Sequence, residues 1–169
     1  MEIRQATLAD RPAFLTLWKE FLIDHAKQGG VIEVCDENIR AYLGLFESYI
    51  AGGLFGGTFI AWEGDEAVGV LMGGETPPGG FYVRTTRGRT CTVWGTYIVP
   101  KHRRKGIAWA LQDMARPLAR KQGFDTLTSS IITSDPVSSA NALNWGLKIT
   151  EAIVTFPLGE TEHGRQRST

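Results

Sequence analysis

The sequence has little of the material that several classes of protein require. Its 169 residues include only two cysteines, Cys35 and Cys91, with no Cys-x-x-Cys pair and no clustered histidine. This argues against a zinc site or a disulfide scaffold and favours two reduced, partly buried thiols. No stretch approaches the roughly 20 apolar residues that span a bilayer, and the N-terminus MEIRQATLAD lacks the pattern of a signal peptide. We therefore expect a cytoplasmic protein with no metal and no membrane partner.

The chain also lacks net charge. Eighteen Lys and Arg residues balance 18 Asp and Glu residues, whereas general nucleic-acid binding depends on excess positive charge. We therefore expect no nucleic-acid partner, although a local basic patch remains compatible with this balance. The length fits one domain with one sizeable core. We expect a single domain over residues 1–158 and a polar tail over residues 159–169, which contain almost no apolar side chain.

Hydrophobic periodicity predicts the element order β-α-α-β-β-β-α-β-α-β. Thr7 or Asp10 can cap the first helix, and Asp36 the second. Pro117 should kink or shorten the third helix. A strand–helix–strand unit from Thr90 to Thr133 implies a parallel pair with a right-handed crossover. The expected strands are Glu2–Ala6, Thr58–Trp62, Ala67–Met72, Thr90–Val99, Thr126–Thr133 and Lys148–Phe156, and the last two helices are Gly106–Gln122 and Val137–Trp145.

One segment, from Tyr97 to Ala108, carries the pattern of an anion site. It is the end of a strand, a proline stop, a basic loop and a glycine at the start of an amphipathic helix. The first turn of a helix has backbone N–H groups without partners and a positive dipole, so it binds phosphate. Small side chains at Gly106 and Ala108 let an anion approach the backbone. The nearby cations can add charge for a pyrophosphate or a 3′-phosphate, and they are Arg103, Arg104 and Lys105.

The basic run from Lys101 to Lys105 has other interpretations. It is also compatible with a solvated loop, a nuclear-import signal or a nucleic-acid patch. The chain contains neither a Walker lysine loop nor Gly-x-Gly-x-x-Gly. A nucleic-acid patch would not need Gly106 and Ala108 in register with a helix start, so the phosphate site is the stronger hypothesis.

These motifs resemble those of the GCN5-related N-acetyltransferase (GNAT) superfamily. The family's cofactor motif is Arg/Gln-x-x-Gly-x-Gly/Ala after a strand that ends in hydrophobic-x-Pro, and Arg103-x-x-Gly106-x-Ala108 after Val99-Pro100 fits it. Ile3-Arg4-Gln5-Ala6 followed by Asp10 fits the family's N-terminal pattern. The resemblance implies an α/β (α+β) fold: a mixed, mostly antiparallel sheet with a splayed parallel strand pair and helices on both faces.

The resemblance also implies a co-substrate and a reaction. Acetyl-CoA would donate its acetyl group to a primary amine of a small molecule or peptide by direct attack, without a metal. Backbone groups of the splayed strand would hold the pantetheine arm, and one N–H would polarise the thioester carbonyl. Backbone amides after the strand would hold the pyrophosphate. The cofactor-binding residues implied in this way are Ile98, Val99, Arg103, Arg104, Lys105, Gly106, Ile107 and Ala108, with His102 in support.

Catalytic groups are less clearly indicated. Glu75 is a candidate base, directly or through water, although its position in a loop is more typical of an ordinary exposed glutamate. Tyr97, at the end of the splayed strand, is a candidate acid or a core residue. The tyrosine that many family members carry corresponds to Ala142 here, so we assign no catalytic acid. The alternative function is a non-catalytic acyl-CoA-binding or regulatory module with a degenerate GNAT fold.

The sequence says least about the acceptor. The first two helices and the loop from Gly73 to Arg89 would form the acceptor wall in this fold. The loop is rich in arginine, which is compatible either with a lid that favours an acceptor bearing carboxylate or phosphate or with a mobile connection. Homodimer formation is compatible with the sequence but not indicated by it. The side chains of interest in this loop are Phe81, Tyr82, Arg84, Arg87 and Arg89.

Overall fold

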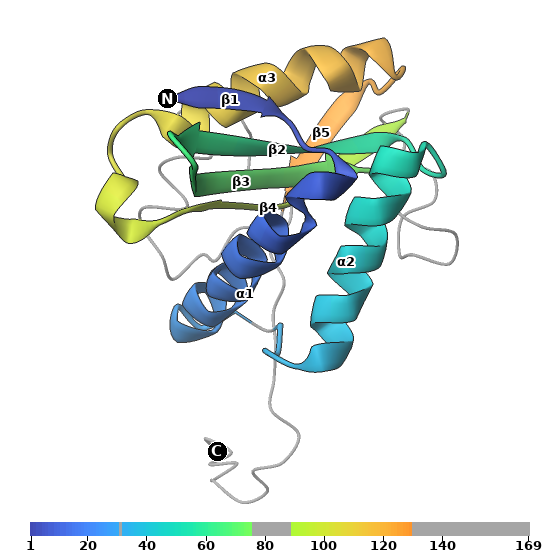
Figure 1. Cartoon of the computed structure of the whole chain (residues 1–169). Helices are drawn as coiled ribbons and strands as arrows, with labels where there is room; N and C mark the ends of the chain where they lie inside the picture. The colour runs from blue at the N-terminus through green and yellow to red at the C-terminus, as the bar shows by residue number, and fades with distance from the viewer. Residues whose placement is uncertain (31, 76–88, 130–169) are drawn as a thin grey trace, which may run out of the picture.

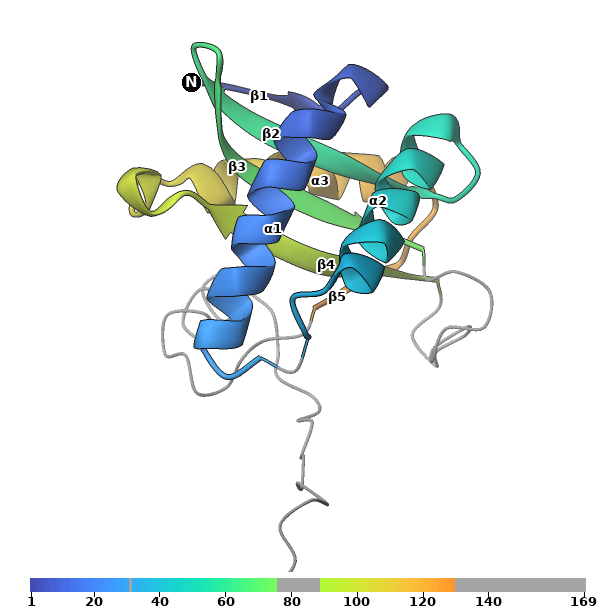
Figure 2. The same cartoon turned by 60° about the horizontal axis from the view of Figure 1, so that its bottom comes forward.

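The computed structural model describes residues 1–30, 32–75 and 89–129. In these residues α1 and α2 cover one face of a five-stranded sheet and α3 covers the other (Figures 1 and 2). The expected helices on both faces of the sheet are therefore confirmed. In chain order, the elements are β1 (Glu2–Gln5), the 3-10 turn η1 (Leu8–Asp10), α1 (Arg11–Lys27), α2 (Asp36–Ala51), β2 (Gly56–Glu63), β3 (Glu66–Gly74), β4 (Thr90–Ile98), the 3-10 turn η2 (Pro100–His102), α3 (Ile107–Lys121) and β5 (Thr126–Ser129).

The sheet is mixed, as predicted. Its strand order is β1-β2-β3-β4-β5, and the first three pairings are antiparallel. β4 and β5 are parallel, from Thr90 opposite Thr126 to Val93 opposite Ser129, and α3 is the crossover between them. The expected opening of this pair falls beyond Ser129, so it stays a prediction. The helix expected at Val137–Trp145, the strand at Lys148–Phe156 and the tail also lie outside the described residues.

The core between the sheet and helices α1 and α2 is rich in aromatic rings. Phe14 and Phe46 are fully buried and stack with their ring centroids 4.4 Å apart. Trp18 continues the stack at 5.2 Å from Phe14. Each buried ring of this size contributes a few kcal/mol through the area removed from water. This core fixes the two helices that were expected to form the acceptor wall.

Of the two caps predicted for the first helix, Asp10 stands at the N-cap position of α1, without a side-chain capping hydrogen bond, and Thr7 precedes the short turn η1. Thr7 occupies the N-cap position of η1, and its backbone and hydroxyl both donate to Asp10 at 2.8 and 2.9 Å. Asp10 is in turn the N-cap residue of α1. The prediction for the second helix is off by one residue: Cys35 is at the N-cap and Asp36 is the first residue of α2. Asp36 still favours the helix from there, because a carboxylate in the first turn faces the positive end of the dipole.

Of the two outcomes predicted for Pro117, a kinked or a shortened third helix, the shortening does not occur. Pro117 lies inside α3, which continues to Lys121. A proline removes one helical hydrogen bond, but packing on both sides of Pro117 holds the helix. Leu111 before it and Ala119 after it are buried against the sheet. Tertiary packing therefore outweighs the local preference of proline.

Both cysteines are free thiols, as expected. Cys35 is partly buried and Cys91 is buried in β4. Burial raises the pKa of Cys91 to about 12, so its thiolate is scarcely populated at neutral pH. Cys91 is therefore a core residue rather than a nucleophile.

Candidate functional site

A β-bulge interrupts β4 at Trp94. Met72 of β3 pairs with Gly95 and the next residue, Gly73, pairs with Val93, so Trp94 has no opposite residue. As a result Trp94 and Gly95 both face α1 and α2; a Cβ on Gly95 would lie 2.7 Å from the ring of Phe21. A bulge bends its strand and disturbs regular pairing. Here it follows Val93, the residue at which the described pairing of β4 with β5 ends.

Beyond the bulge, alternate backbone N–H and C=O groups of β4 point away from β3. The N–H of Val99 donates to the carbonyl of Val68 in β3 at 3.0 Å. Because backbone groups alternate in direction along a strand, the N–H groups of Ile98 and Thr96 point to the opposite side, toward the β5 edge. The carbonyl of Ile98 on that side accepts a hydrogen bond from Arg103 Nε at 3.0 Å.

The turn between β4 and α3 places two residues in the left-handed region. Arg104 has a φ of 63° and Gly106 a φ of 76°. Gly106 is the N-cap of α3, and nothing lies within 4 Å of where its Cβ would be. The helix ladder begins with Ala110 N–H donating to the Gly106 carbonyl at 3.1 Å. The amides of Ile107 and Ala108 therefore have no acceptor within the helix, and they face a space that is open at Gly106.

The basic residues of this turn divide into two groups. Lys101 pairs with Glu66 at 2.7 Å, and Arg103 pairs with Asp24 of α1 at 2.8 Å. In the part of the chain that the structure describes, the exposed side chains of Arg104 and Lys105 have no ion pair. The Arg103 N–H is also engaged, since it donates to the Pro100 carbonyl at 3.2 Å. The positive charge available to an anion thus comes from Arg104 and Lys105, with Arg103 holding the turn.

His102 lies beneath this turn. Its side chain is 8% exposed, and Nδ1 lies 2.9 Å from Glu63 Oε2 at the end of β2. Its Nε2 is buried and has no hydrogen-bond partner among residues 1–30, 32–75 and 89–129. The contact with Glu63 ties η2 to the β2–β3 hairpin, and the expected role of His102 beside the cofactor stays a prediction.

Tyr97 points away from α3, into the core beneath α1. Its hydroxyl donates to Glu20 Oε2 at 3.2 Å, and the Arg103 guanidinium lies 5.6 Å from its ring centroid. Burial, followed by the Glu20 carboxylate, raises the pKa of Tyr97 to about 12. Such a phenol is a weak acid whose proton is already committed to a carboxylate.

Glu75 lies at the other end of the sheet. β3 runs antiparallel to β4, so that Gly74 pairs with Thr92 while Gly69 pairs with Ile98. Six residues of strand separate these two positions on β4, about 20 Å at the usual rise. The Glu75 carboxylate is 4.0 Å from Arg89. The structure therefore does not bring Glu75 and Ile98 together.

Two consecutive hydrogen bonds connect the backbone carbonyl of Glu75 to Trp94 at the bulge. The indole of Trp94 donates to the Tyr49 hydroxyl at 2.8 Å, and that hydroxyl donates to the Glu75 carbonyl at 3.0 Å. Burial raises the pKa of Tyr49 to about 12. No pattern in the sequence indicates these hydrogen bonds, because both the bulge and the approach of α2 depend on contacts between distant segments.

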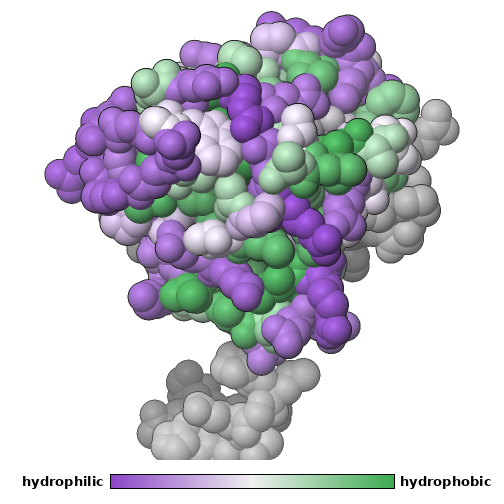
Figure 3. Space-filling model, in the orientation of Figure 1, coloured by the Kyte–Doolittle hydropathy of each residue, from purple (hydrophilic) through white to green (hydrophobic). Residues whose placement is uncertain are grey.

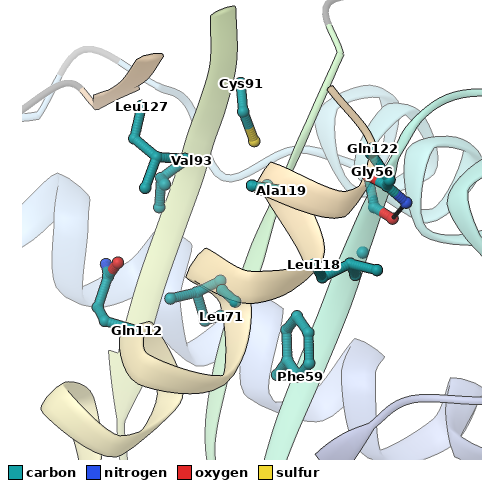
Figure 4. A pocket seen from close by; sticks show the side chains of 13 residues that line it. Gly56, Phe59, Leu71, Cys91, Val93, Gln112, Leu118, Ala119, Gln122 and Leu127 are labelled. Carbon is teal, nitrogen blue, oxygen red and sulfur yellow. Dashed lines mark hydrogen bonds between the residues drawn. The ribbon is translucent and has the colours of Figure 1, made fainter. Parts of the chain in front are cut away.

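A small apolar pocket lies under α3, on the face of the sheet away from α1 and α2 (Figure 4). Two of its lining side chains are amides, Gln112 and Gln122, and Gln122 Nε2 donates to the Gly56 carbonyl at 3.1 Å. The pocket follows the C-terminal half of α3 and is distinct from the open space at Gly106. Its other lining residues are Gly57, Phe59, Leu71, Gly73, Cys91, Val93, Ala115, Leu118, Ala119 and Leu127.

Neither a metal cluster nor a membrane helix is found in the described ranges. Residues 1–30, 32–75 and 89–129 hold no group of three or more His, Cys, Asp or Glu side chains that could bind a metal ion. No helix in the same ranges is both long enough and apolar enough to cross a bilayer.

Comparison of the whole fold with solved structures gives close matches at low sequence identity. A structure of AAC(6')-Iy in complex with the bisubstrate analogue CoA-S-monomethyl-acetylneamine matches with a TM-score of 0.70 and 16% identity, over 92% of this chain and 96% of that one. A predicted acetyltransferase with acetyl-CoA from Clostridium acetobutylicum matches with a TM-score of 0.70 and 20% identity, over 96% and 99%. The aminoglycoside 6'-N-acetyltransferase AAC(6')-IG from Acinetobacter haemolyticus matches with a TM-score of 0.66 and 20% identity, over 95% and 100%.

These likenesses establish the fold. No curated protein matches the sequence. The family model described as the acetyltransferase (GNAT) family matches residues 17–142, which include the bulged strand, the Arg103–Ala108 turn and α3. The chain therefore belongs to the GNAT acetyltransferase family.

Proposed function

We propose that this protein transfers the acetyl group of acetyl-CoA to a primary amine of a small molecule or peptide. The observation that carries the proposal is the junction of β4 and α3. A bulged strand with outward-facing amides leads there into a glycine-capped helix start with two unpaired cations nearby. The open space at Gly106 and the amides of Ile107 and Ala108 suit a pyrophosphate.

The backbone amides at the β5 edge of β4 suit the rest of the cofactor. Ile98 and Thr96 direct N–H groups to that side, where an extended pantetheine arm would run along the strand. An N–H in this position would stabilise the negative charge that develops on the thioester oxygen during attack. The chain thus offers donors for both ends of the cofactor on one continuous segment.

The chemistry follows from direct attack. The amine nitrogen forms a bond to the acetyl carbon, the carbon–sulfur bond breaks, and CoA leaves as a thiolate with the electron pair. The amine loses one proton and the departing thiolate gains one. An alkylammonium with a pKa near ~10 must be deprotonated before it can react. The chain's contribution in the described region is therefore binding, alignment and polarisation of the carbonyl.

The acceptor would approach from the side of α1 and α2. Trp94 and Gly95 face this side of the bulge. Hydrophobic surface gathers over the lower part of these two helices in Figure 3, and Ile23 of α1 and Val34, just before α2, stay 43% and 40% exposed. This surface suits an acceptor with apolar parts beside its amine. The AAC(6') structures above carry aminoglycoside names, and an amine of that kind belongs in the first set of acceptors to test.

The test of the function is turnover. Purified protein is incubated with acetyl-CoA and a panel of aminoglycosides, polyamines and peptide amines, and released thiol is measured for each. We expect thiol release that depends on the amine and rises with pH. Cofactor binding without release for any amine would overturn the catalytic part of the proposal.

A non-catalytic acyl-CoA-binding module is the second candidate. It is favoured because both catalytic candidates already have partners within the fold. The Tyr97 hydroxyl donates to Glu20, and the Glu75 carboxylate lies near Arg89. The two candidates share the cofactor site and differ only in turnover. The amine panel distinguishes them directly.

A further inference from the structure

Gln112 is a polar residue on the buried face of α3. Its relative exposure is 5%, and the other buried residues of this helix are Ile107, Leu111 and Ala119. An amide that is removed from water costs free energy unless its N–H and C=O groups find partners. Buried side-chain amides in proteins accordingly have partners in most cases.

The structure supplies no such partner in the ranges that it describes. Within residues 1–30, 32–75 and 89–129 the Gln112 amide makes no hydrogen bond, and its atoms are not among the fully buried polar atoms without a partner, so the amide keeps some access from the pocket side. Gln122 provides a direct contrast on the same helix and in the same pocket, because its amide binds the Gly56 carbonyl (Figure 4). The Gln122 amide thus has a hydrogen-bond partner within the fold, and the Gln112 amide does not.

The position of Gln112 is close to the expected path of the pantetheine arm. It lines the pocket together with Val93 of β4 and Leu127 of β5, and Figure 4 shows its amide on the side of these two residues. Val93 is the residue before the bulge, where the described pairing with β5 ends. Along α3, Gln112 is six residues from Gly106, about 9 Å at the helical rise. A pantetheine arm that starts at a pyrophosphate beside Gly106 and enters between β4 and β5 would therefore pass close to Gln112.

A second unpaired group lies on the same side of the sheet. The Oγ1 atom of Thr96 is buried without a hydrogen-bond partner among the described residues. Thr96 pairs with Leu71, which belongs to the apolar cluster under α3. Polar groups without partners therefore occur on both the helix and the strand that border the expected arm.

We propose that the side-chain amide of Gln112 binds one of the two secondary amides of the pantetheine arm. A primary amide offers a donor and an acceptor, which match the C=O and N–H of a secondary amide. The inference rests on the proposed use of acetyl-CoA and assigns a positioning residue to that same site. Gln112 fixes how far the arm enters and hence where the thioester lies relative to the bulge.

The test compares two glutamines on one helix with two ligands. Gln112→Leu and Gln122→Leu are titrated with CoA and, by displacement, with 3′-phospho-ADP, which carries all the phosphates of CoA but no pantetheine. We expect Gln112→Leu to raise the Kd for CoA about threefold to tenfold, the value of one lost hydrogen bond, with no change for the nucleotide. The melting temperature of the free protein should stay the same or rise, because an unpaired amide is replaced by an apolar group.

The matched control should behave in the opposite way. Gln122→Leu removes a hydrogen bond within the fold, so the melting temperature should fall by about 2–4 °C while the Kd for CoA stays unchanged. The deciding quantity is the ratio of the two Kd values, which general loss of folded protein does not alter. Gln112→Met replaces Gln112→Leu if the leucine variant does not fold.

Three results would overturn the inference. One is an unchanged ratio of Kd values in the Gln112 variant. Another is that neither Gln112 variant folds, which would make the amide a structural group. The third is that the wild-type protein does not bind CoA, and this result would also overturn the proposed function. A wild type that binds CoA with an unchanged ratio in the variant leaves the proposed function intact and removes only the role of Gln112.

Discussion

Arg103 Nη2 lies 2.8 Å from Asp24 Oδ2, and this contact joins the turn after β4 to α1, 79 residues away in the sequence. The same guanidinium donates to the Ile98 carbonyl and lies over the ring of Tyr97. These three contacts fix the start of the Arg103–Ala108 turn relative to α1. Arg103 matches the family motif in the sequence, but in the structure its side chain holds the turn in place.

The first prediction separates Arg103 from its neighbours. Arg103→Ala should lower the free energy of unfolding by about 1 kcal/mol, since its ion pair is partly exposed and only its hydrogen bonds add much. Its Kd for acetyl-CoA should change by less than about threefold. The double variant Arg104→Ala, Lys105→Ala should instead raise that Kd by about tenfold and make it less sensitive to salt, because two unpaired cations are lost.

Urea unfolding and calorimetric titration at low and high salt give both quantities. The double variant should keep its stability within about 0.5 kcal/mol, as is usual for surface changes. A larger loss of affinity in Arg103→Ala than in the double variant would mean that Arg103 leaves Asp24 to bind phosphate.

The second prediction concerns Gly106. Its φ of 76° disfavours any side chain, although the space around it is open. Gly106→Ala should therefore cost about 1 kcal/mol of stability through the backbone alone, and acetyl-CoA should still raise the melting temperature. Gly106→Glu has the same backbone cost and adds a negative charge where phosphate would lie, so it should abolish the shift. Thermal melts of both variants with and without acetyl-CoA test this, and a normal shift in Gly106→Glu would refute the site.

Local patterns in the sequence were enough for the order of elements as far as Ser129 and for the strand–turn–helix junction at residues 98–108. Glycine and proline mark the ends of elements through their own backbone geometry. Gly52 closes α2 with a φ of 75°, and Pro100 comes two residues after the last residue of β4. The Arg103–Ala108 motif is likewise contiguous. Such features can be read from one segment without knowledge of its surroundings.

Features that depend on distant contacts were not accessible in this way. The bulge at Trp94 arises from the pairing of β4 with β3, and no residue pattern announces it. The partner of Arg103 lies on α1. Gln112 does stand out as a polar residue within an apolar helix face, but its orientation toward β5 follows only from the packing of α3. Pro117 shows the reverse case, where a strong local signal is outweighed by packing.

The third prediction addresses the catalytic candidates. Tyr97→Phe should keep the rate of acetyl transfer within about threefold, because a phenol with its pKa raised to about 12 and bound to Glu20 is a poor donor to a thiolate whose conjugate acid has a pKa near ~8.5. Glu75→Gln should also retain its rate, since Glu75 lies at the far end of β4. Activity of all three proteins should rise with pH as the acceptor amine loses its proton.

Steady-state rates across pH check both variants. A fall of about a hundredfold or more in either one, the size expected for a lost general acid or base, would identify that residue as catalytic. Loss of the rise with pH in Glu75→Gln alone would point to Glu75 as the base.

The last prediction concerns acid stability and the pair Arg4–Asp10. Two guanidinium nitrogens of Arg4 donate to the Asp10 carboxylate at 2.7 and 2.8 Å, and Thr7 donates to it twice more. The hydrogen bond from Arg4, opposed by burial and aided by Thr7, holds the pKa of Asp10 well below its usual range. A carboxyl group whose pKa is lower in the folded state stabilises the fold above its unfolded pKa of about 4, and this contribution is lost as the pH falls below that value.

Asp10→Asn should therefore lower the free energy of unfolding by about 2–3 kcal/mol at neutral pH, and the difference from wild type should shrink as the pH falls from about 5 toward 2. Glu2→Gln is the control, because the Glu2 carboxylate is exposed and 3.8 Å from Arg4, and it should change stability by less than about 0.5 kcal/mol. Urea unfolding of the three proteins across this pH range measures the difference directly. A difference between wild type and Asp10→Asn that stays constant with pH would show that Asp10 acts through its shape and hydrogen bonds, and that its charge does not stabilise the start of α1.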